Sequence, residues 1–464
     1  MKTILALANT SMFIRNIIRT DIRDAFACAD VRMIMLAPKE KLAYYRSEFS
    51  DPLLQFEELP RLKKMRRESL FQFLENSSIH THTTTMLQKT KFRRFKSSGY
   101  MIMRLPRFIF ARACWHLGQF AWWRNLIRAI YACVPNHAFD EVIETYKPDL
   151  IFCPSMFYTE DYVLLKAAKR YCIKNLGMIL SWDNFYSKTF LRVFPDHLIV
   201  HTDMIRDLAA KYGDYPLSRV SVTGVPQYDR HFRRQGVVSR EDFIRSLGGD
   251  PSKKLIVYAF SGKAGLHIDF DVLDILANAV KDGKIKEEVN VLMRPYPKFD
   301  MKEERADEFR RKYKFLARTS VAHVGPKGEY DWEFDEPSIN FLENTLAHAD
   351  LVISMYSTFF IEAAILDKPL IGIAFDGYKE DLDYENSARR FFDWNHLQDV
   401  KELNGIRLVS SRDEMIRAVN EYLGRPDSDH EGRKKIIVQQ CQFTDGKSAR
   451  RVADVLLSCL DSRN

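Results

Sequence analysis

The chain has 464 residues, and because a single hydrophobic core rarely grows beyond about 250–300 residues, we expect two domains. Hydrophobic residues make up 46% of the chain and aromatic residues 12%, with only 19 Gly and 17 Pro, which excludes a disordered, collagenous or low-complexity protein. The net charge of +8 is unevenly spread: residues 61–128 hold fifteen Lys and Arg against two Glu, so this window carries +13 and predicts a local binding surface.

The N-terminal apolar run covers only residues 4–8 before polar residues begin, which is too short for the core of a signal peptide. The longest apolar region, 101–135, is interrupted by five arginines, so it lacks the roughly 20 uncharged residues that span a bilayer. Seven cysteines form no CxxC pair. We therefore expect a cytoplasmic protein with reduced thiols.

Short aliphatic runs alternate with helical patterns, which is typical of βα units and parallel sheets. In the first half the predicted strands are 3–8, 32–37, 149–154, 176–181, 197–201 and 219–223. In the second half they are 254–260, 289–293, 321–324, 351–354, 370–375 and 406–409. A polar, basic segment between the halves places the domain boundary near residue 232, giving domains 1–232 and 233–464.

The region 61–131 lacks the βα pattern and is predicted to be a helical insert of the N-terminal domain. Its Ser-, Thr- and His-rich stretch 76–85 predicts a mobile connection. The last helices, within 433–460, are assigned to the C-terminal domain, and packing back on the N-terminal domain is left open.

A candidate phosphate site follows the strand 351–354, where a hydroxyl-rich turn after Ser354 leads into a helix predicted to begin near Ser357. Free N–H groups at a helix start attract anions, so Ser357 and Thr358 are candidate phosphate ligands. Glu362 lies four residues after Thr358, on the same helical face, and is a candidate acceptor of ribose hydroxyl hydrogen bonds. The alternative is that Ser357 only caps the helix and Glu362 is solvated.

A second candidate element is the turn after strand 289–293, where two prolines hold the chain between Arg294 and Lys298, with Tyr296 between them. Ligands of open α/β sheets bind outside the carboxyl ends of the strands. An arginine fork and a lysine point charge at such an end suit a diphosphate.

The third element is Ser261, Gly262 and Lys263, after the first strand of the second half, where small residues allow close approach of a ligand. Downstream, Asp269 and Asp271 have the DxD spacing of some metal sites, but we expect them at the start of a helix, where acidic residues favour the helix dipole. We expect no catalytic metal.

Taken in chain order, these segments resemble the nucleotide-binding half of GT-B glycosyltransferases, most closely the group of CDP-glycerol glycerophosphotransferases and bacterial capsule or lipopolysaccharide glycosyltransferases. The group's Arg-Pro-His-Pro-like turn and Ser-Asp-Tyr-Ser-Ser stretch, with a following acidic residue and Lys-Pro, are matched by 294–297, 354–358, Glu362 and 368–369. Tyr296 replaces the usual His and Met355 the usual Asp, which favours sugar transfer over transfer of glycerophosphate or phosphoribitol.

The resemblance implies an α/β GT-B fold, with two Rossmann-like domains, a central cleft and the basic aromatic insert in the N-terminal domain. It further implies a glycosyltransferase that uses a nucleotide-activated sugar as its donor and a cell-surface glycan or lipid-linked acceptor, with neither a cofactor nor a metal.

In the N-terminal domain, Trp182, Asp183 and Asn184 follow a predicted strand and are expected to reach the cleft. Asp183 is the leading candidate base for an acceptor hydroxyl, and Glu160 is the second. The alternative for both carboxylates is a capping or turn role. Asn9, Thr10 and Ser11 end the first strand and are candidate donor or acceptor contacts, with a helix N-cap as the alternative.

The insert combines arginines with aromatic residues, which suits contact with anionic lipid headgroups through residues 89–128. The residues concerned are Arg104, Arg107, Arg112, Arg124, Arg128, Phe108, Phe110, Trp115, Phe120, Trp122 and Trp123. No RRM, KH or zinc-finger pattern supports nucleic-acid binding. We therefore expect a peripheral protein at the inner face of the membrane, while packing of the aromatics within the insert is the alternative.

Two other functions stay open at this point. A non-hydrolysing UDP-N-acetylglucosamine 2-epimerase shares the fold, and a non-catalytic GT-B-like module would bind a polysaccharide or a membrane partner without transfer.

Overall fold

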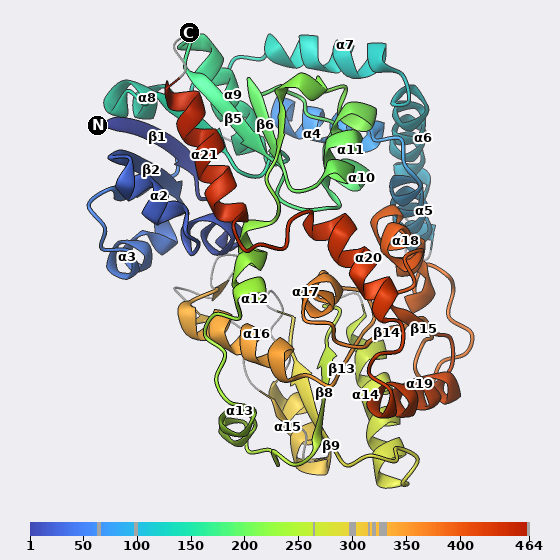
Figure 1. Cartoon of the computed structure of the whole chain (residues 1–464). Coiled ribbons are helices and arrows are strands. Elements are labelled where there is room, and N and C mark those ends of the chain that lie inside the picture. The colour runs from blue at the N-terminus through green and yellow to red at the C-terminus, as the bar shows by residue number, and fades with distance from the viewer. Residues whose placement is uncertain are drawn as a thin grey trace. The chain divides into compact units, whose positions relative to one another are not determined.

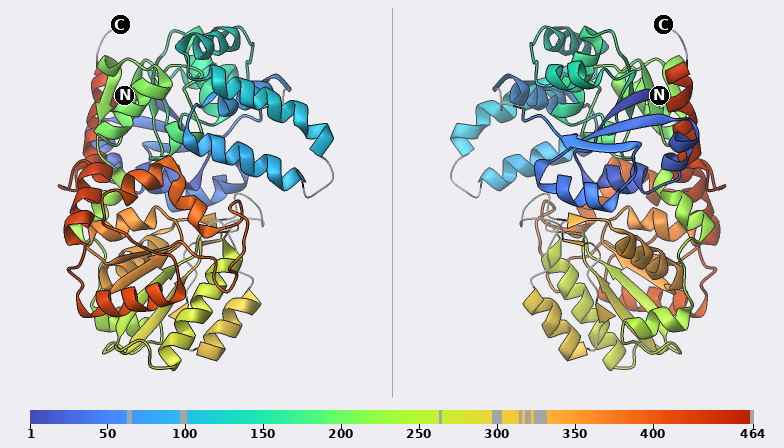
Figure 2. Two further views of the ribbon diagram at one scale, coloured as in Figure 1. Left: turned by 90° about the vertical axis from the view of Figure 1, so that its right-hand side faces the viewer. Right: turned by 90° about the vertical axis from the view of Figure 1, so that its left-hand side faces the viewer.

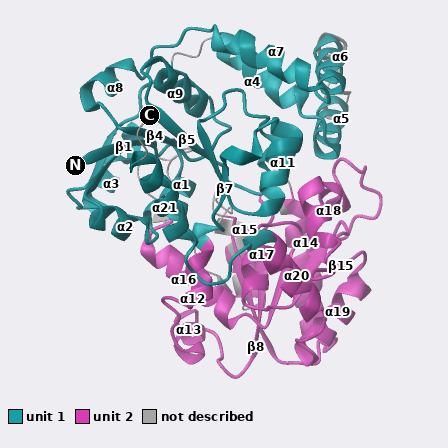
Figure 3. Ribbon diagram, turned by 45° about the horizontal axis from the view of Figure 1, so that its top comes forward, with its two compact units in different colours: residues 1–227, 324–330, 440–464 teal, residues 228–323, 331–439 magenta. Residues whose placement is uncertain are grey.

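The computed structural model describes residues 1–461 except 63–65, 97–100, 263–264, 297–302, 314–315, 318–321 and 324–331. It divides into two compact units (Figures 1 and 3). The first unit comprises Met1–Gln227 and Gln440–Asn464, together with the segment Val324–Tyr330, which lies outside the described residues. The second comprises Tyr228–His323 and Asp331–Gln439. The chain thus passes between the units after Gln227.

The first unit is built on a parallel sheet of seven strands in the order β3-β2-β1-β4-β5-β6-β7. These strands are β1 (Lys2–Leu7), β2 (Val31–Ala37), β3 (Leu54–Glu58), β4 (Leu150–Cys153), β5 (Lys174–Met178), β6 (His197–Val200) and β7 (Val220–Val222). Ile4 of the central strand β1 is in register with Met33 on one side and Leu150 on the other. The edge strand β3 is missing from the sequence prediction because its LQFEE segment mixes apolar and polar residues.

Helices cover both faces of this sheet. They are α1 (Ser11–Phe13), the π-helix η1 (Ile14–Ile18), α2 (Ile22–Cys28), α3 (Lys39–Glu48), α8 (Asp140–Tyr146), α9 (Thr159–Arg170), α10 (Asn184–Ser187), α11 (Asp203–Gly213), η2 (Leu217–Arg219), η3 (Pro226–Tyr228) and α21 (Ser448–Asp461). The C-terminal helix α21 buries Val452 and Leu456 in the same hydrophobic cluster as Ile4 and Phe26. The last helix of the chain therefore completes the core that begins at the first strand.

The insert forms four helices, α4 (Arg66–Ser78), α5 (His82–Lys96), α6 (Met101–Leu117) and α7 (Ala121–Ala132), and α5 and α6 extend from the unit as a hairpin (Figure 2). The predicted mobile connection 76–85 is instead a buried corner between α4 and α5. Thr84 is buried, and its hydroxyl donates to the carbonyl of Ile79 at 2.6 Å. The hydroxyl groups of this polar stretch form hydrogen bonds with nearby backbone groups, where the sequence predicted contact with water.

The second unit has a parallel sheet of six strands in the order β10-β9-β8-β13-β14-β15. Its strands are β8 (Lys254–Ala259), β9 (Val289–Arg294), β10 (Leu316–Ala317), β13 (Leu351–Ser354), β14 (Leu370–Ile373) and β15 (Arg407–Val409). Two more strands, β11 (Ala322–His323) and β12 (Trp332–Glu333), pair antiparallel in a separate ribbon. The run predicted at 321–324 therefore does not join the main sheet.

The helices of the second unit are α12 (Asp229–Arg233), α13 (Arg240–Ser246), α14 (Leu266–Lys281), α15 (Glu303–Tyr313), α16 (Glu336–His348), α17 (Phe359–Ile365), η4 (Ala388–Asp393), α18 (Asn395–Lys401), α19 (Arg412–Gly424) and α20 (His430–Cys441). Side-chain caps begin several of them. Ser239, Asp335 and Ser411 each accept a backbone N–H of the first helical turn. Over the described residues, no helix has the length and apolar content needed to cross a membrane.

Candidate functional site

In the second unit, the strand order reverses between β8 and β13, since β9 and β10 extend the sheet one way and β14 and β15 the other. Such a switch point leaves room for a ligand outside the carboxyl ends of the strands. Ser261 and Gly262 follow β8, Arg294 ends β9, and Ser354 ends β13. The three sequence elements predicted to bind the donor thus meet at one edge of one sheet.

Arg294 links two of these elements through a direct contact. Its guanidinium carbon lies 4.5 Å from the centre of the Phe359 ring, and Phe359 is the first residue of α17. The Arg294 residue is 8% exposed. A cation from the end of β9 is therefore held beside the start of the helix that follows β13.

The helix α17 begins at Phe359, two residues later than predicted. Thr358 is the N-cap residue and is exposed, while the Ser357 hydroxyl accepts the Phe359 N–H at 3.1 Å. Glu362 lies in the first turn, four residues after Thr358, and is 5% exposed. Ser357 thus has the capping role named as its alternative, and Thr358 carries the more accessible hydroxyl.

Gly262 and Tyr296 lie against each other. Gly262 has a φ of +87°, and a Cβ atom at this position would lie 3.3 Å from the Tyr296 ring. Both the left-handed backbone and the close ring disfavour any other residue at 262. The aromatic ring, which is 40% exposed, is therefore seated on the backbone of the turn after β8.

Of the remaining predicted donor-binding residues, one has a different role and two are not described. The Ser354 side chain is buried, and its hydroxyl donates to the carbonyl of Ala259 at 2.9 Å, so it stabilises the β8–β13 strand pair and does not face a ligand. Lys263 and Lys298 lie outside the described residues.

Asp269 has a role that the sequence did not reveal. Helix α14 begins at Leu266, so Asp269 lies in its first turn, where it is buried and accepts the Ser261 hydroxyl at 2.7 Å, the Ser261 N–H at 3.1 Å and the Tyr258 hydroxyl at 3.0 Å. Burial raises its pKa to about 7. Asp269 fixes the turn after β8, and an acidic residue at a helix start is the only signal of it in the sequence.

The sheet of the first unit has its switch point between β1 and β4. Asn9 follows β1 and is 8% exposed, and its side-chain oxygen has no hydrogen-bond partner among the described residues. Thr10 caps α1 through its hydroxyl. Ser11 is buried, and its hydroxyl accepts the ammonium of Lys41 at 2.6 Å. Thr10 thus has the capping role, while the Asn9 amide lies at the switch point with hydrogen-bonding capacity left.

The predicted acceptor loop after β5 is largely packed. Trp182 is 8% exposed and Asn184 is fully buried, with its amide donating to the carbonyl of Ser155 at 3.3 Å. Asp183 precedes α10 and forms an ion pair with Lys188, with 3.0 Å between Oδ2 and Nζ. The Asp183 side chain is 19% exposed, so the candidate base is a partly accessible, ion-paired carboxylate.

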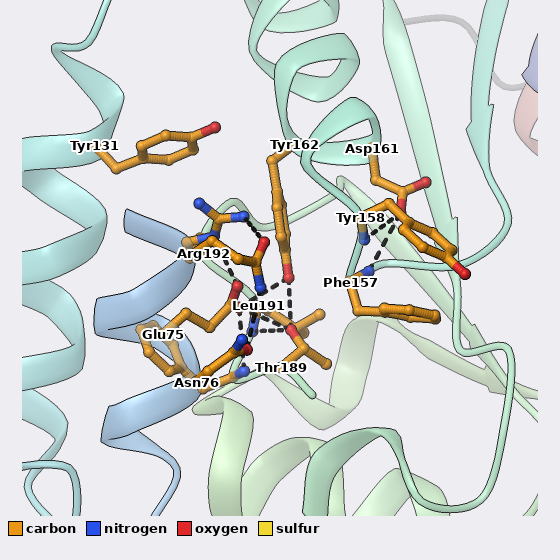
Figure 4. Close-up of polar contacts among 12 residues, drawn as sticks. Glu75, Asn76, Tyr131, Phe157, Tyr158, Asp161, Tyr162, Thr189, Leu191 and Arg192 are labelled. Carbon is orange, nitrogen blue, oxygen red and sulfur yellow. Dashed lines mark hydrogen bonds and ion pairs between the residues drawn. The ribbon is translucent and has the colours of Figure 1, made fainter. Parts of the chain in front are cut away.

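Glu160 and Asp161 lie in the first turn of α9, and their surroundings differ; Figure 4 shows those of Asp161. Asp161 is buried, and one carboxylate oxygen accepts the Ser155 hydroxyl at 2.6 Å and the N–H groups of Phe157 and Tyr158 at 3.2 and 3.0 Å. Burial raises the pKa of Asp161 to about 7 and also raises that of Glu160. Asp161 fixes the loop after β4, as Asp269 fixes the loop after β8, and Glu160 is the more accessible carboxylate.

A buried ion pair attaches the insert to the sheet of the first unit (Figure 4). Glu75 of α4 and Arg192 approach to 2.7 Å, and both side chains are fully buried. Glu75 also accepts the hydroxyls of Tyr162 and Thr189, at 2.9 and 3.0 Å. The Arg192 guanidinium lies 4.4 Å from the centre of the Tyr162 ring. Sequence patterns could not reveal this cluster, because Glu75 is more than 80 residues from each of its partners.

The arginines of helix α7, which were predicted to face lipid headgroups, face the interior of the first unit. Arg124 and Arg128 face inward and pair with Asp214, and Arg128 also donates to the carbonyl of Phe190 at 2.7 Å. These two arginines are therefore paired with a carboxylate and do not form the outward face of α7. The outward face is apolar: Trp122 and Ile130 are 57% and 52% exposed. The expected basic aromatic surface is, on α7, an apolar surface with buried cations.

The other aromatic residues of the insert divide between packing and exposure. Trp115 stacks on His80, and Phe108 on Phe92, whereas Phe110 and Phe120 are exposed. Arg107 is exposed, and nothing is described of the Arg104 side chain.

The whole chain shares its fold with a glycosyltransferase and with UDP-GlcNAc 2-epimerases. A glycosyltransferase from Rickettsia africae superposes with a TM-score of 0.52 at 10% identity, over 100% of this chain and 99% of that one. The UDP-GlcNAc 2-epimerase from Neisseria meningitidis bound to UDP-GlcNAc gives 0.51 at 11% identity, over 99% and 100%. The UDP-GlcNAc 2-epimerase from Methanocaldococcus jannaschii superposes with a TM-score of 0.53 at 13% identity, over 99% of this chain and 100% of that one. These likenesses confirm the predicted α/β fold with two Rossmann-like sheets.

Sequence comparison identifies the family. Among curated proteins, none matches the chain. The model of the family described as CDP-Glycerol:Poly(glycerophosphate) glycerophosphotransferase matches residues 183–458, which is more than half of the chain and includes Arg294, Thr358 and Glu362. The protein therefore belongs to the CDP-Glycerol:Poly(glycerophosphate) glycerophosphotransferase family, as the resemblance of its two motifs predicted.

Proposed function

We propose that the protein is a glycosyltransferase that moves a sugar from a nucleotide-activated donor to a hydroxyl of a cell-surface glycan or lipid-linked acceptor. The observation that carries this proposal is the meeting of Arg294 with the start of α17 at the switch point of the second sheet. A planar guanidinium and the exposed Thr358 hydroxyl, both at the positive end of a helix, suit the two phosphates of a nucleoside diphosphate. UDP-GlcNAc bound to the N. meningitidis enzyme of the same fold supports a nucleotide sugar as donor.

The proposed reaction breaks the bond between the sugar anomeric carbon and the phosphate oxygen, and forms a bond from that carbon to the acceptor oxygen. The leaving nucleotide gains negative charge, which Arg294, the Thr358 hydroxyl and the positive end of the α17 dipole would stabilise without a metal ion. Glu362, at the same helix start, would accept hydrogen bonds from the ribose hydroxyls. The proton of the acceptor hydroxyl would pass to Asp183 or, as the second candidate, Glu160.

Isothermal titration calorimetry with CMP, CDP, UDP and GDP tests the donor site. We expect one of the diphosphates to bind, with Arg294→Ala weakening its affinity at least tenfold, a loss of about 1.4 kcal/mol. Arg417→Ala is the matched control, because Arg417 is an exposed arginine of α19 in the same unit. Equal affinity of the Arg294 variant and the control would refute the assignment.

The transferred group is the next question, because the family is described by glycerophosphate transfer. Met355 occupies the position where related sequences carry Asp, and its side chain is fully buried beneath Gly265. A carboxylate is therefore absent at this position, which supports sugar transfer. Sugar transfer from a diphosphate donor releases a nucleoside diphosphate, whereas glycerophosphate transfer from CDP-glycerol releases CMP. Identification of the released nucleotide separates the two.

The epimerase alternative rests on the shared fold alone. It predicts conversion of UDP-N-acetylglucosamine to the manno epimer with no acceptor present, and NMR of the sugar product detects this directly. A non-catalytic module would release no nucleotide from any donor and would tolerate Asp183→Asn.

We also propose that the protein works at the inner face of the membrane through the insert. The two acidic residues of the window 61–131, Glu68 and Glu75, are both buried, whereas Lys89, Lys91 and Arg107 are exposed. Exposed cations with no exposed carboxylate in the same window favour an anionic surface. Flotation with vesicles that contain phosphatidylglycerol tests this location.

A further inference from the structure

The first unit contains a cavity of about 690 Å³ that the proposed reaction does not use. It lies between the end of α7, the end of α9 and the segment 192–194. Its basic lining residues are Arg128, His137, Lys166, Lys169, Arg170 and Arg192. Among the described residues, no carboxylate lines it. We name it the basic cavity.

Three of the lining arginines form ion pairs with carboxylates that do not line the cavity. Arg128, Arg170 and Arg192 pair with Asp214, Asp140 and Glu75, respectively. Lys166 and Lys169 form no ion pair within the described part of the chain. The two lysines therefore bring positive charge to the cavity without a direct carboxylate partner, and the carboxylates that act on them from a distance are Glu68 for Lys166 and Asp196 for Lys169.

Lys166 is 7% exposed, and its ammonium donates to the backbone carbonyls of Tyr131, at 3.1 Å, and Val134. Desolvation lowers its pKa. The carboxylate of Glu68 favours the charged form of Lys166, but it already accepts hydrogen bonds from Tyr131 and Asn136. An anion in the basic cavity would supply the missing counter-charge.

The outward face of α7 leads into this cavity. Trp122, Leu126, Ala129 and Cys133 are spaced by four, three and four residues, so they form one stripe along the helix, and all four are exposed. Ala129 and Cys133 also line the basic cavity. We call these four residues, with the adjacent Ile130, the apolar stripe. An exposed apolar face of this kind marks an interaction site.

We propose that the basic cavity binds the phosphate of an anionic glycerophospholipid while the apolar stripe lies at the boundary between headgroups and acyl chains. A free phosphate would match the cavity but leave the stripe in water, whereas a lipid matches both features. Surface helices with one apolar face lie in the membrane plane in this way. This inference rests on the proposed membrane location and adds which helix contacts the membrane and which group of the lipid is bound.

The test is flotation of the full-length protein with phosphatidylcholine vesicles that contain phosphatidylglycerol, at 0.15 M salt, where charges beyond about 8 Å are largely screened. Lys169→Glu is compared with Lys435→Glu, which makes the same charge change at an exposed lysine of the other unit. Leu126→Ser is compared with Leu217→Ser, since these leucines are 43% and 49% exposed.

We expect Lys169→Glu and Leu126→Ser each to reduce the vesicle partition coefficient about tenfold, and both controls to stay within about twofold of wild type. Equal losses for Lys169→Glu and Lys435→Glu would mean general charge attraction and would overturn the cavity assignment. Glycerol 3-phosphate could instead raise the Tm of the wild type but not of Lys169→Glu, while the wild type does not bind vesicles. That result would show that the cavity binds a soluble phosphate and would overturn the proposal of a lipid ligand.

The same four variants are titrated with the nucleotide that binds wild type. Unchanged nucleotide affinity shows that the donor site is intact, so a failure of the lipid proposal is distinguishable from a failure of the proposed transferase function. Wild-type protein that does not float with these vesicles overturns the membrane proposal but leaves the nucleotide measurements standing.

Discussion

Two buried aspartates define the loops at the switch points of both sheets. Asp161 and Asp269 each lie in the first turn of a helix and accept hydrogen bonds from a serine hydroxyl and from backbone N–H groups of the preceding loop. Their hydrogen bonds only partly offset the cost of burial, so the pKa of each is raised to about 7. These residues hold the turns of the candidate sites in place, and neither needs to touch a ligand.

Asp161 makes the stability of the protein pH-dependent. In the unfolded chain its pKa is about 3.9, so between about pH 4 and pH 7 the folded state holds a proton that the unfolded state has lost. The stability that Asp161 contributes therefore decreases as the pH rises through this window. Differential scanning calorimetry measures the decrease in Tm between pH 5 and pH 8. We expect this decrease to be smaller in Asp161→Asn than in wild type, and to be unchanged in the control Asp24→Asn, which alters an exposed site. A variant with the wild-type change in Tm would contradict this role.

At the scale of elements, the insert depends on charges that the sequence places far apart. The α4 helix is joined to the sheet by Glu75 and Arg192, and α7 by Arg124, Arg128 and Asp214. The Arg128 guanidinium also donates hydrogen bonds to the backbone carbonyls of Phe190 and Gly213. With its cations directed inward, α7 leaves its apolar residues on the surface.

Glu75→Ala leaves the Arg192 guanidinium buried without a carboxylate, and we expect a loss of about 3–5 kcal/mol of unfolding free energy. Leu70→Ala, at an exposed site of the same helix, is expected to change it by less than about 0.5 kcal/mol. Replacement of both partners, in Glu75→Met with Arg192→Met, is expected to recover most of the loss, because no unpaired charge is left. Urea denaturation measures all three, and a double variant as unstable as Glu75→Ala would contradict this account.

At the scale of the whole molecule, the chain leaves the first unit after Gln227, forms the second and returns to the first at Gln440. The returning helix α21 buries Leu456 in the core of the first unit, and Lys2 of β1 pairs with Asp461 at the end of α21. The first unit is therefore complete only when the last helix has been made.

Leu456→Ala should destabilise the first unit by about 2–5 kcal/mol, because it opens a cavity in a fully buried cluster. In hydrogen exchange, we expect peptides from β1 and β2 to exchange faster and peptides from β8 and β13 to keep their wild-type rates. Ser458→Ala, at an exposed site of the same helix, is the control. Equal acceleration in both units would show that they unfold together.

The central strands could be predicted from the sequence, and candidate ligand motifs could be placed at their ends, because both depend on local chemistry. The runs that became β1, β4, β8 and β13 are mostly apolar, and the proline turn expected after Arg294 and the hydroxyl-rich segment before α17 depend on neighbouring residues. The edge strand β3 was missed because its exposed side is polar. The role of Ser354 was wrong because a hydroxyl on a strand bonds to whatever backbone the neighbouring strand presents, here Ala259.

By itself, the sequence determined the βα architecture, the family and the position of the donor motifs, since strand burial, helix starts and proline turns are encoded within a few residues of one another. Only the tertiary structure decided which charges are buried and which surfaces are exposed. The arginines of α7 face inward because Asp214, about 90 residues away, lies where they can pair with it. Contacts between segments distant in the chain leave no local pattern in the sequence. Because of these contacts, the outward face of α7 is apolar, where the sequence predicted a basic surface.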